Sequence, residues 1–569
     1  MATYHGENSR KITKVVVMVI SFVVIAAIVI SVVVVADGPE KDEPQSTHNN
    51  GTIASLEAVC GYTDYKETCK NTLAPVGRGN QSEVTIYFRA SVNATLVEMS
   101  RAKGISEAGA KEATGNYMER YTLEDCMQLL DLGIDQLNYV LAMVPASDLL
   151  TMKSDDVRNS LSAVVSYQQT CIEGLVVAKS KSNFDKDLQK SIELASNSLA
   201  IIYEYSDNDD KKGEAKKTRR LLSIAEEDIN DEEEDNVGYP TWMSGADRRL
   251  LESKDIIVPH AVVAQDGTGQ YDTISEALKA YPKNLGGRYI IYVKSGQYRE
   301  TVTVAKEKTQ VFMYGDGPSE TVVIGRWKNT TVYRSATFSA VGKGFICKHM
   351  GFTSAGYRPD KVALRVQSDQ SAFFNCSIDG SIGPLFTVAH RQFYRQCNIT
   401  GNSHIIRGDS TVVIQNSQII VKKPVLTKNA TITAHARSDR HESTGFVLHN
   451  CSIVPDEEFK SERLNFSTYL GEPLANYSRT AVMESMLGDF IHPDGWLKGN
   501  GIIGVDSVNF LEYKNRGPGA QTNKRVEWPG HREIKDKDEA MGYSAGRFIQ
   551  IEKWLTPDVK LPYQAGLYS

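Results

Sequence analysis

The sequence predicts two folded parts joined by a charged segment: an all-α helical bundle followed by an all-β solenoid. Residues 122–144 and 157–177 keep apolar side chains three and four positions apart with little glycine, which is typical of helices packed on one face. From Val258 onward short β-rich runs dominate. Between them, residues 206–256 are rich in charge and read as a solvated linker.

The N-terminal residues contain one long apolar run, 15–36, preceded by a basic segment, 1–14. At 1.5 Å per residue the run is long enough to cross a hydrocarbon layer of ~30 Å. We predict a transmembrane signal anchor with residues 1–14 in the cytosol, as in a single-pass type II membrane protein. The alternative is a cleaved signal and secretion. Both place the rest of the chain in the secretory lumen, and we expect glycans at Asn80, Asn93, Asn329 and Asn465.

Composition excludes several classes of function. The net charge of −6 over 569 residues argues against a strongly basic nucleic-acid binder. The chain has no Walker motif and no paired CxxC, so a nucleotide site and a structural zinc have no support, and we expect no cofactor.

Four cysteines lie in the predicted bundle, residues 50–205. Cys60 and Cys69 are close enough in sequence to tie a hairpin, and Cys126 and Cys171 fall on different predicted helices that a bond would join. In an oxidising compartment we favour structural disulfides over metal binding.

The solenoid prediction rests on repeated units that end alike: FFNCSI at 373–378, FYRQCNI at 393–399, VIQNSQI at 413–419 and FVLHNCSI at 446–453. Equivalent residues in stacked rungs lie ~4.8 Å apart, within the Cα separation of a disulfide. We therefore predict a bond between Cys376 and Cys397. By the same stacking Cys451 faces Ser417, and Cys347 lies outside the register, so both should be free buried thiols. After Ile453 the pattern is lost, which predicts loops and a terminal helix packed on the solenoid.

The linker contains the tetrapeptide RRLL twice. We interpret both copies as protease sites between the two parts, although they could be ordinary charged linker residues. The residues are Arg219, Arg220, Leu221 and Leu222, and Arg248, Arg249, Leu250 and Leu251.

An ordered series of motifs between residues 50 and 569 resembles the plant pectin methylesterases. These are GQYRE at 296–300, VALRV at 362–366, HRQFYR at 390–395, YLG at 469–471, EY at 512–513, GPGA at 517–520 and WPG at 528–530. The helical region resembles the pectinesterase-inhibitor prodomain of this family. The resemblance implies a four-helix bundle, a right-handed parallel β-helix over residues 257–569, the pairings Cys60–Cys69 and Cys126–Cys171, cleavage at RRLL and a place in the cell wall.

The family's chemistry uses five residues: a nucleophilic aspartate, an acid/base aspartate, two oxyanion glutamines and an arginine, without a metal. Carried over position by position, all five have changed in this chain. The oxyanion glutamines become Asp360 and Ile382, the acid/base becomes Gly383, the nucleophile becomes His404 and the arginine becomes Glu472. The substrate-stacking tryptophan becomes Leu474.

These replacements predict a β-helix without pectin methylesterase activity, because losing even one oxyanion donor costs ~10² to 10³ in rate. The alternative is an active pectinesterase whose catalysts lie at other positions. A rebuilt site is a further alternative, in which Asp360, His404 and Glu472 converge as a base or metal site.

Two binding functions stay open. Arg358, Lys361, Arg365, Arg391 and Arg407 could line a groove that binds polygalacturonate, the pectin backbone, or could pair with neighbouring acids. The bundle could inhibit other pectinesterases in trans or assist folding of its own chain.

Overall fold

The computed structural model describes residues 53–76, 81–113, 115–144, 154–177, 184–221, 258–326, 330–355, 360–499, 503–555 and 561–569. The predicted anchor at 15–36, the sequons at Asn80 and Asn329 and the second RRLL copy lie outside these residues. Within them, no helix has the length and apolar character needed to cross a membrane.

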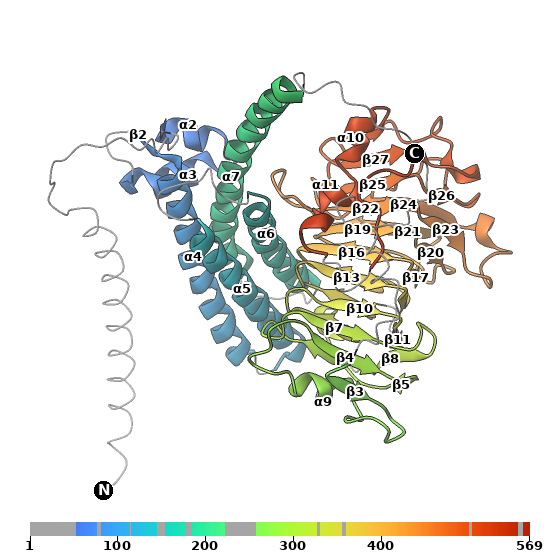
Figure 1. Ribbon diagram of the computed structural model, residues 1–569. Helices are drawn as coiled ribbons and strands as arrows, with labels where there is room; N and C mark the ends of the chain where they lie inside the picture. The colour runs from blue at the N-terminus through green and yellow to red at the C-terminus, as the bar shows by residue number, and fades with distance from the viewer. Residues whose placement is uncertain are drawn as a thin grey trace, which may run out of the picture. The chain divides into compact units, whose positions relative to one another are not determined.

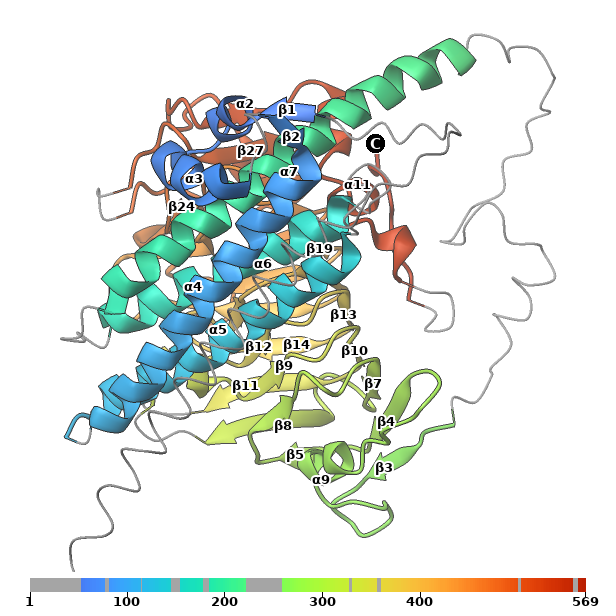
Figure 2. The same cartoon turned by 90° about the vertical axis from the view of Figure 1, so that its left-hand side faces the viewer.

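The N-terminal part is helical, as predicted. Its four long helices are α4 (Val84–Glu112), α5 (Tyr117–Met143), α6 (Ser154–Val177) and α7 (Phe184–Leu221), which pack side by side (Figure 2). They follow a short β1–β2 pair (Ile53–Ser55 and Gln81–Glu83) and the small helices α2 (Leu56–Gly61) and α3 (Lys66–Leu73). Disulfides join Cys60 to Cys69 and Cys126 to Cys171, so both predicted bonds in the bundle are confirmed.

The β-rich part is a parallel β-helix whose described strands form three sheets (Figure 1). The first sheet has eleven strands: β3 (Ala261–Val263), β4 (Tyr289–Val293), β7 (Val311–Tyr314), β10 (Ile346–Lys348), β13 (Ser371–Phe374), β16 (Arg391–Arg395), β19 (Thr411–Gln415), β22 (Gly445–His449), β25 (Arg479–Met483), β27 (Asn509–Tyr513) and β28 (His531–Glu533). The second has eight: β5 (Gly296–Tyr298), β8 (Thr321–Arg326), β11 (Gly351–Ala355), β14 (Ser377–Asp379), β17 (Asn398–Gly401), β20 (Gln418–Val421), β23 (Ser452–Pro455) and β26 (Met486–Leu487). The third has seven: β6 (Val302–Val304), β9 (Phe338–Ala340), β12 (Leu364–Val366), β15 (Leu385–Thr387), β18 (Ile406–Gly408), β21 (Asn429–His435) and β24 (Ser467–Pro473).

The predicted rungs have the predicted register. Ser377 pairs with Asn398, Asn398 with Gln418, and Gln418 with Ser452, so the residues before them stack as equivalents. Inside the coil, Phe373 and Tyr394 stack with ring centroids 4.9 Å apart, and the interior side chains form one continuous apolar core.

A column of residues with left-handed backbone turns the chain from the first sheet into the second. These residues are His349, Asn375, Gln396, Asn416, Asn450, Glu484 and Lys514, with φ between 44° and 56°. Asparagine tolerates this conformation better than most side chains, which explains its recurrence before the rung anchors. Side chains of this column also form hydrogen bonds with each other: Asn450 Nδ2 donates to Asn416 Oδ1 at 3.2 Å.

The predicted bond between Cys376 and Cys397 is wrong: both thiols are free and buried. Stacked residues of a parallel ladder have Cα–Cβ bonds that run parallel, so their Cβ atoms stay about one strand spacing apart. A disulfide needs Cβ atoms roughly 3.5 to 4.5 Å apart. Cys347 and Cys451 are free and buried, as predicted.

Two predicted boundaries differ from the structure. Strands of all three sheets continue after Ile453 up to β28, and only then do α10 (Lys537–Met541) and α11 (Ala545–Phe548) follow. This C-terminal segment covers an apolar layer on the first sheet. At the other junction, α7 continues to Leu221, so the first RRLL copy begins within a helix instead of a linker.

Candidate functional site

His404 and Glu472 are in direct contact at the edge of the third sheet. His404, with φ of 45°, lies two residues before β18, and Glu472 lies within β24. His404 Nε2 is bonded to Glu472 Oε1, which also accepts a hydrogen bond from Thr431 Oγ1 at 3.2 Å. The position predicted for a nucleophile and the position predicted for its arginine therefore meet, but as an imidazole and a carboxylate.

Ile382 and Gly383 lie one coil away on the same edge. Ile382 forms a parallel bridge with Ser403, and Gly383 N donates to Ser403 O at 3.1 Å. Gly383 has φ of 63°, and a Cβ added there would lie 2.6 Å from Cδ of Arg407. The arginine side chain thus occupies the space that a side chain at 383 would need.

Asp360 and Arg407 line a cavity of about 180 Å³ together with side chains of the helical bundle. Arg407 lies over the Phe386 ring at 4.8 Å, and its NH2 is 4.0 Å from Glu173 Oε2 on α6. Burial lowers the pKa of the Arg407 guanidinium. Helices α5 and α6 therefore cover this side of the site.

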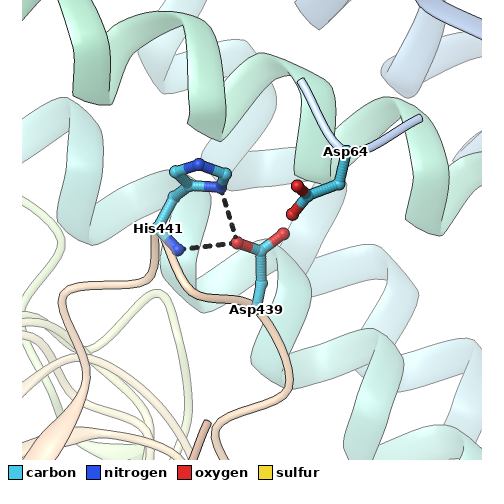
Figure 3. A group of neighbouring side chains, drawn as sticks. All are labelled: Asp64, Asp439 and His441. Carbon is cyan, nitrogen blue, oxygen red and sulfur yellow. Dashed lines mark hydrogen bonds and ion pairs between the residues drawn. The ribbon is translucent and has the colours of Figure 1, made fainter. Parts of the chain in front are cut away.

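The described residues contain one group of three potential metal ligands whose ligand atoms all lie within 4.8 Å of one another: Asp64, Asp439 and His441 (Figure 3). Asp360, His404 and Glu472 do not form such a group. In Figure 3, Asp439 Oδ1 accepts hydrogen bonds from His441 N and Nδ1, at 2.7 and 2.9 Å. Asp64 Oδ1 pairs with Arg440 at 2.8 Å, so hydrogen bonds within the protein account for this cluster.

The arginines predicted to line a binding groove are buried in protein contacts. Arg391 forms a two-pronged ion pair with Asp369, at 3.0 and 2.8 Å, and a third contact with Asp156 of α6 at 2.8 Å. Burial would raise the pKa of Asp369, but Arg391 holds it well below its ordinary value. Arg365 stacks on the Tyr333 ring at 3.6 Å and donates to its carbonyl oxygen.

Three further residues predicted to bind substrate or to line the groove do not decide between substrate binding and pairing within the protein. Lys361 is buried, the side chain of Leu474 is half-buried, and Arg358 lies outside the described residues. The arginines that the structure describes thus fit the alternative that the sequence left open, pairing with neighbouring groups of the protein.

Sequence reasoning missed the polar face by which the bundle binds the β-helix. Asp125 of α5 accepts bonds from Arg334 and from Thr331 Oγ1, and Asn159 of α6 donates to Asp369 Oδ1 at 3.2 Å. A loop of the β-helix, residues 437–444, receives further contacts, and we call it the clamp loop. Its contacts include Ser162 with Ser443, Ser196 with Asp439 and Arg440 with Asp64. Nothing in the spacing of these polar residues distinguishes them from solvent-exposed helix positions.

Comparison with known proteins identifies both parts. Residues 260–552 match the pectinesterase family, and residues 54–201 match the plant invertase/pectin methylesterase inhibitor family. The chain is 31% identical to pectinesterase/pectinesterase inhibitor 3 of Arabidopsis thaliana over 592 residues, covering 99% of both chains. The chain belongs to the pectinesterase/pectinesterase inhibitor family. Its β-helix also superimposes on pectin methylesterase from carrot with a TM-score of 0.53 and 37% identity, over 55% of this chain and 99% of the other.

One motif that carries the family resemblance, EY at 512–513, has a structural role. In this pectinesterase-type β-helix the buried Glu512 accepts hydrogen bonds from Arg525 Nε at 2.8 Å and from Trp496 Nε1 at 3.2 Å. Burial would raise the pKa of Glu512, but hydrogen bonds from His531 and Arg525 lower it. Glu512 therefore stabilises the interior of the coil.

Proposed function

We propose that this chain is a non-catalytic member of the pectinesterase/pectinesterase inhibitor family that acts at the plant cell wall on or with methylesterified homogalacturonan. The single observation that carries the proposal is the contact between His404 and Glu472. At the two positions that the family resemblance gives to the nucleophile and the arginine that holds it, this chain has an imidazole bonded to a carboxylate.

The surrounding groups supply no substitute for the lost chemistry. Ester hydrolysis of the family's kind needs an attacking carboxylate and donors aimed at the developing oxyanion. Ile382 and Gly383 carry no donor or acid in their side chains, and the carboxylate of Asp360 repels an oxyanion. Glu472 lies at the position given to the arginine, and its Oε1 is bonded to His404 and Thr431.

The proposal is tested by methanol release from methylesterified pectin, with the full chain compared with a His404→Ala variant. Equal release by both proteins is expected, and turnover by the wild-type chain above the variant would overturn the proposal. A third protein, with D360Q, I382Q, G383D, H404D and E472R and carrying R407A to make room at 383, serves as the positive control. Methanol release by this protein would show that the replaced side chains, and not the helices that cover the site, cause the lack of activity.

Pectin binding without chemistry belongs to the same proposal. Because Arg365 and Arg391 are occupied within the protein, we expect retention on demethylated pectin to be weak and to depend on surface charge. Co-sedimentation at low and high salt measures it, and retention that persists at high salt would contradict this expectation.

Inhibition of other pectinesterases by the bundle is a second candidate. Two ion pairs favour it: Asp125 of the bundle contacts Arg334, and Asp156 contacts Arg391. Neither arginine is one of the five replaced catalytic positions, so the bundle could contact an active pectinesterase in the same way. Residues 50–205 added to an active plant pectinesterase should reduce methanol release, and D125A/D156A should inhibit less. Unchanged release would exclude inhibition in trans.

The proposed setting includes the secretory pathway, with an anchor at 15–36 or release into the wall, and cleavage at the RRLL sequences. Exposed Asn93 and Asn465 are compatible with glycans. Mass spectrometry of the protein from plant cell walls tests all three features.

A further inference from the structure

Two free cysteines of the β-helix lie close together in the coil interior. The Sγ atoms of Cys347 and Cys376 are 3.9 Å apart, and both side chains are at most 1% exposed. Cys347 belongs to β10, and Cys376 lies in the turn between β13 and β14 of the next coil. The two thiols therefore approach each other across neighbouring coils.

The backbone explains why this pair converges and the stacked pair does not. The register partner of Cys347 is Phe373, so Cys376 is three residues farther along, beyond the left-handed residue Asn375. The turn at Asn375 changes the direction of the chain before Cys376. Cys376 and Cys397, in contrast, occupy equivalent positions in successive turns, since Ser377 pairs with Asn398.

The other two thiols of the β-helix face backbone carbonyls. Cys397 Sγ lies 3.5 Å from Phe373 O and 3.4 Å from Arg395 O, and Cys451 Sγ lies 3.2 Å from Ile414 O. Burial raises the pKa of Cys451 to about 12, so this thiol stays protonated at physiological pH. Cys376 also interacts with the Cys397 thiol, and its close Sγ–Sγ approach of 3.9 Å is to Cys347.

We propose that Cys347 and Cys376 form a disulfide when the chain folds in an oxidising compartment. The bundle of the same chain already contains two disulfides, Cys60–Cys69 and Cys126–Cys171, which are typical of such a compartment. The inference concerns this chain's own thiols and does not depend on whether the protein hydrolyses esters.

The bond forms by thiol–disulfide exchange. The thiolate of one cysteine attacks a disulfide of an oxidising oxidoreductase or of glutathione disulfide, giving a mixed disulfide and releasing one thiol of the oxidant. The second cysteine thiolate then displaces the other thiol, so two protons and two electrons leave the pair and the oxidant is reduced to two thiols. Because both sulfur atoms are buried in the folded coil, the exchange must precede closure of these rungs.

The resulting loop joins positions 29 residues apart and contains Asp360 and strand β12. Asp360 lines the cavity between the β-helix and the bundle, and Arg365 of β12 stacks on Tyr333, which lines the same cavity. The bond would therefore hold together the wall of the candidate site that α5 and α6 cover.

The test uses the full chain secreted from a eukaryotic host. Free thiols are alkylated in denaturant and the unreduced protein is digested for mass spectrometry. We expect two alkylated cysteines in the β-helix, Cys397 and Cys451, and a peptide pair that links Cys347 to Cys376. Four alkylated cysteines, or a peptide pair linking Cys376 to Cys397, would overturn the proposal.

Matched substitutions give an independent measurement. Cys347→Ser and Cys451→Ser both exchange a fully buried thiol for a hydroxyl in the same core, so they share the packing cost. Only C347S removes the proposed bond, and it should lower the melting temperature by about 5 to 10 °C more than C451S. Equal melting temperatures for the two variants would count against the bond. The mass spectrum of the wild-type chain decides the question even if neither variant folds.

Discussion

The side chain of Arg407 lies over Gly383, so that a Cβ at position 383 would come within 2.6 Å of Cδ of the arginine. The arginine side chain therefore fills the space that any side chain at position 383 would need. Introducing an aspartate at 383 is consequently a steric problem as well as a chemical one.

We predict that Gly383→Asp costs about 2 to 4 kcal/mol of unfolding free energy, from the left-handed backbone and the clash with Arg407. In a double-mutant cycle with Arg407→Ala, the pair should cost less than the sum of the single variants, because the clash is gone. Urea unfolding measures each value.

Gly267→Asp is the matched control, since Gly267 has φ of 76° and no atom within 4 Å of an added Cβ. It carries the backbone strain without the clash and should cost only about 1 to 2 kcal/mol. Equal costs at 267 and 383 would show that Arg407 does not restrict the site.

A second prediction concerns the ion pairs between the bundle and the β-helix. Asp125 is 6% exposed beside Arg334, whereas Asp155 and Lys553 are 41% and 70% exposed at their contact of 3.1 Å. Asp125→Ala should cost on the order of 2 kcal/mol, because Arg334 loses one of its two carboxylate partners and keeps only Glu124, at 2.9 Å. Lys553→Ala should cost about 0.5 kcal/mol or less, since water replaces the contact. Comparable losses of thermal stability in the two variants would contradict a buried, specific interface.

The third prediction is a loss of stability in acid that depends on His390. Burial lowers the pKa of His390 from 6.5 to about 4 in the folded chain, with Asp369 opposing the shift and Arg391 and Lys343 adding to it. The unfolded chain therefore binds the extra proton first as the pH falls below 6.5. The contribution of the neutral histidine to the free energy of unfolding is complete above that pH and is reduced by about 2 to 3 kcal/mol at pH 4.5.

Urea unfolding of the wild-type chain and of His390→Asn between pH 4.5 and 7 measures this difference. Asparagine tolerates the left-handed backbone at this position, where φ is 71°, and does not titrate. The variant should lose less stability than the wild type on acidification. Parallel pH profiles would mean that His390 is protonated in the folded protein or hydrated.

A fourth prediction addresses Glu512, which holds Arg525 and Trp496 inside the coil. Glu512→Gln keeps the shape but leaves Arg525 without its counter-charge, and should cost about 3 to 5 kcal/mol. Glu533→Gln, at an exposed position of the adjacent strand, should be near neutral. Thermal unfolding distinguishes them, and a neutral Glu512→Gln would indicate that the arginine finds other partners.

The repeated rung endings predicted the coil and its register because they report local burial: the anchors before Ser377, Asn398, Gln418 and Ser452 stack as the sequence indicates. The helices were predictable for the same reason, since apolar spacing reflects one buried face. The error at Cys376 came from using the Cα separation alone, when the direction of the Cα–Cβ bond decides whether two thiols can bond.

The replaced catalytic positions stay a prediction from the sequence, and the contacts of these residues could not be predicted from it. That His404 bonds Glu472 follows from stacking across coils 68 residues apart in sequence, and that Arg407 fills the space above Gly383 depends on a rotamer. The partners of Asp125 and Asn159 depend on how the bundle binds the β-helix, for which no local pattern exists.

The contacts on the clamp loop have a consequence for maturation. Ser162 of α6 and Ser196 of α7 form hydrogen bonds with the clamp loop, which connects β21 to β22. Asp64, in the turn before α3, forms an ion pair with the same loop. Cutting the chain between the bundle and the β-helix alters its covalent topology but leaves these bonds in place. The bundle is then released only if another protein surface binds Asp64, Ser162 and Ser196 in place of the clamp loop, as in competitive binding.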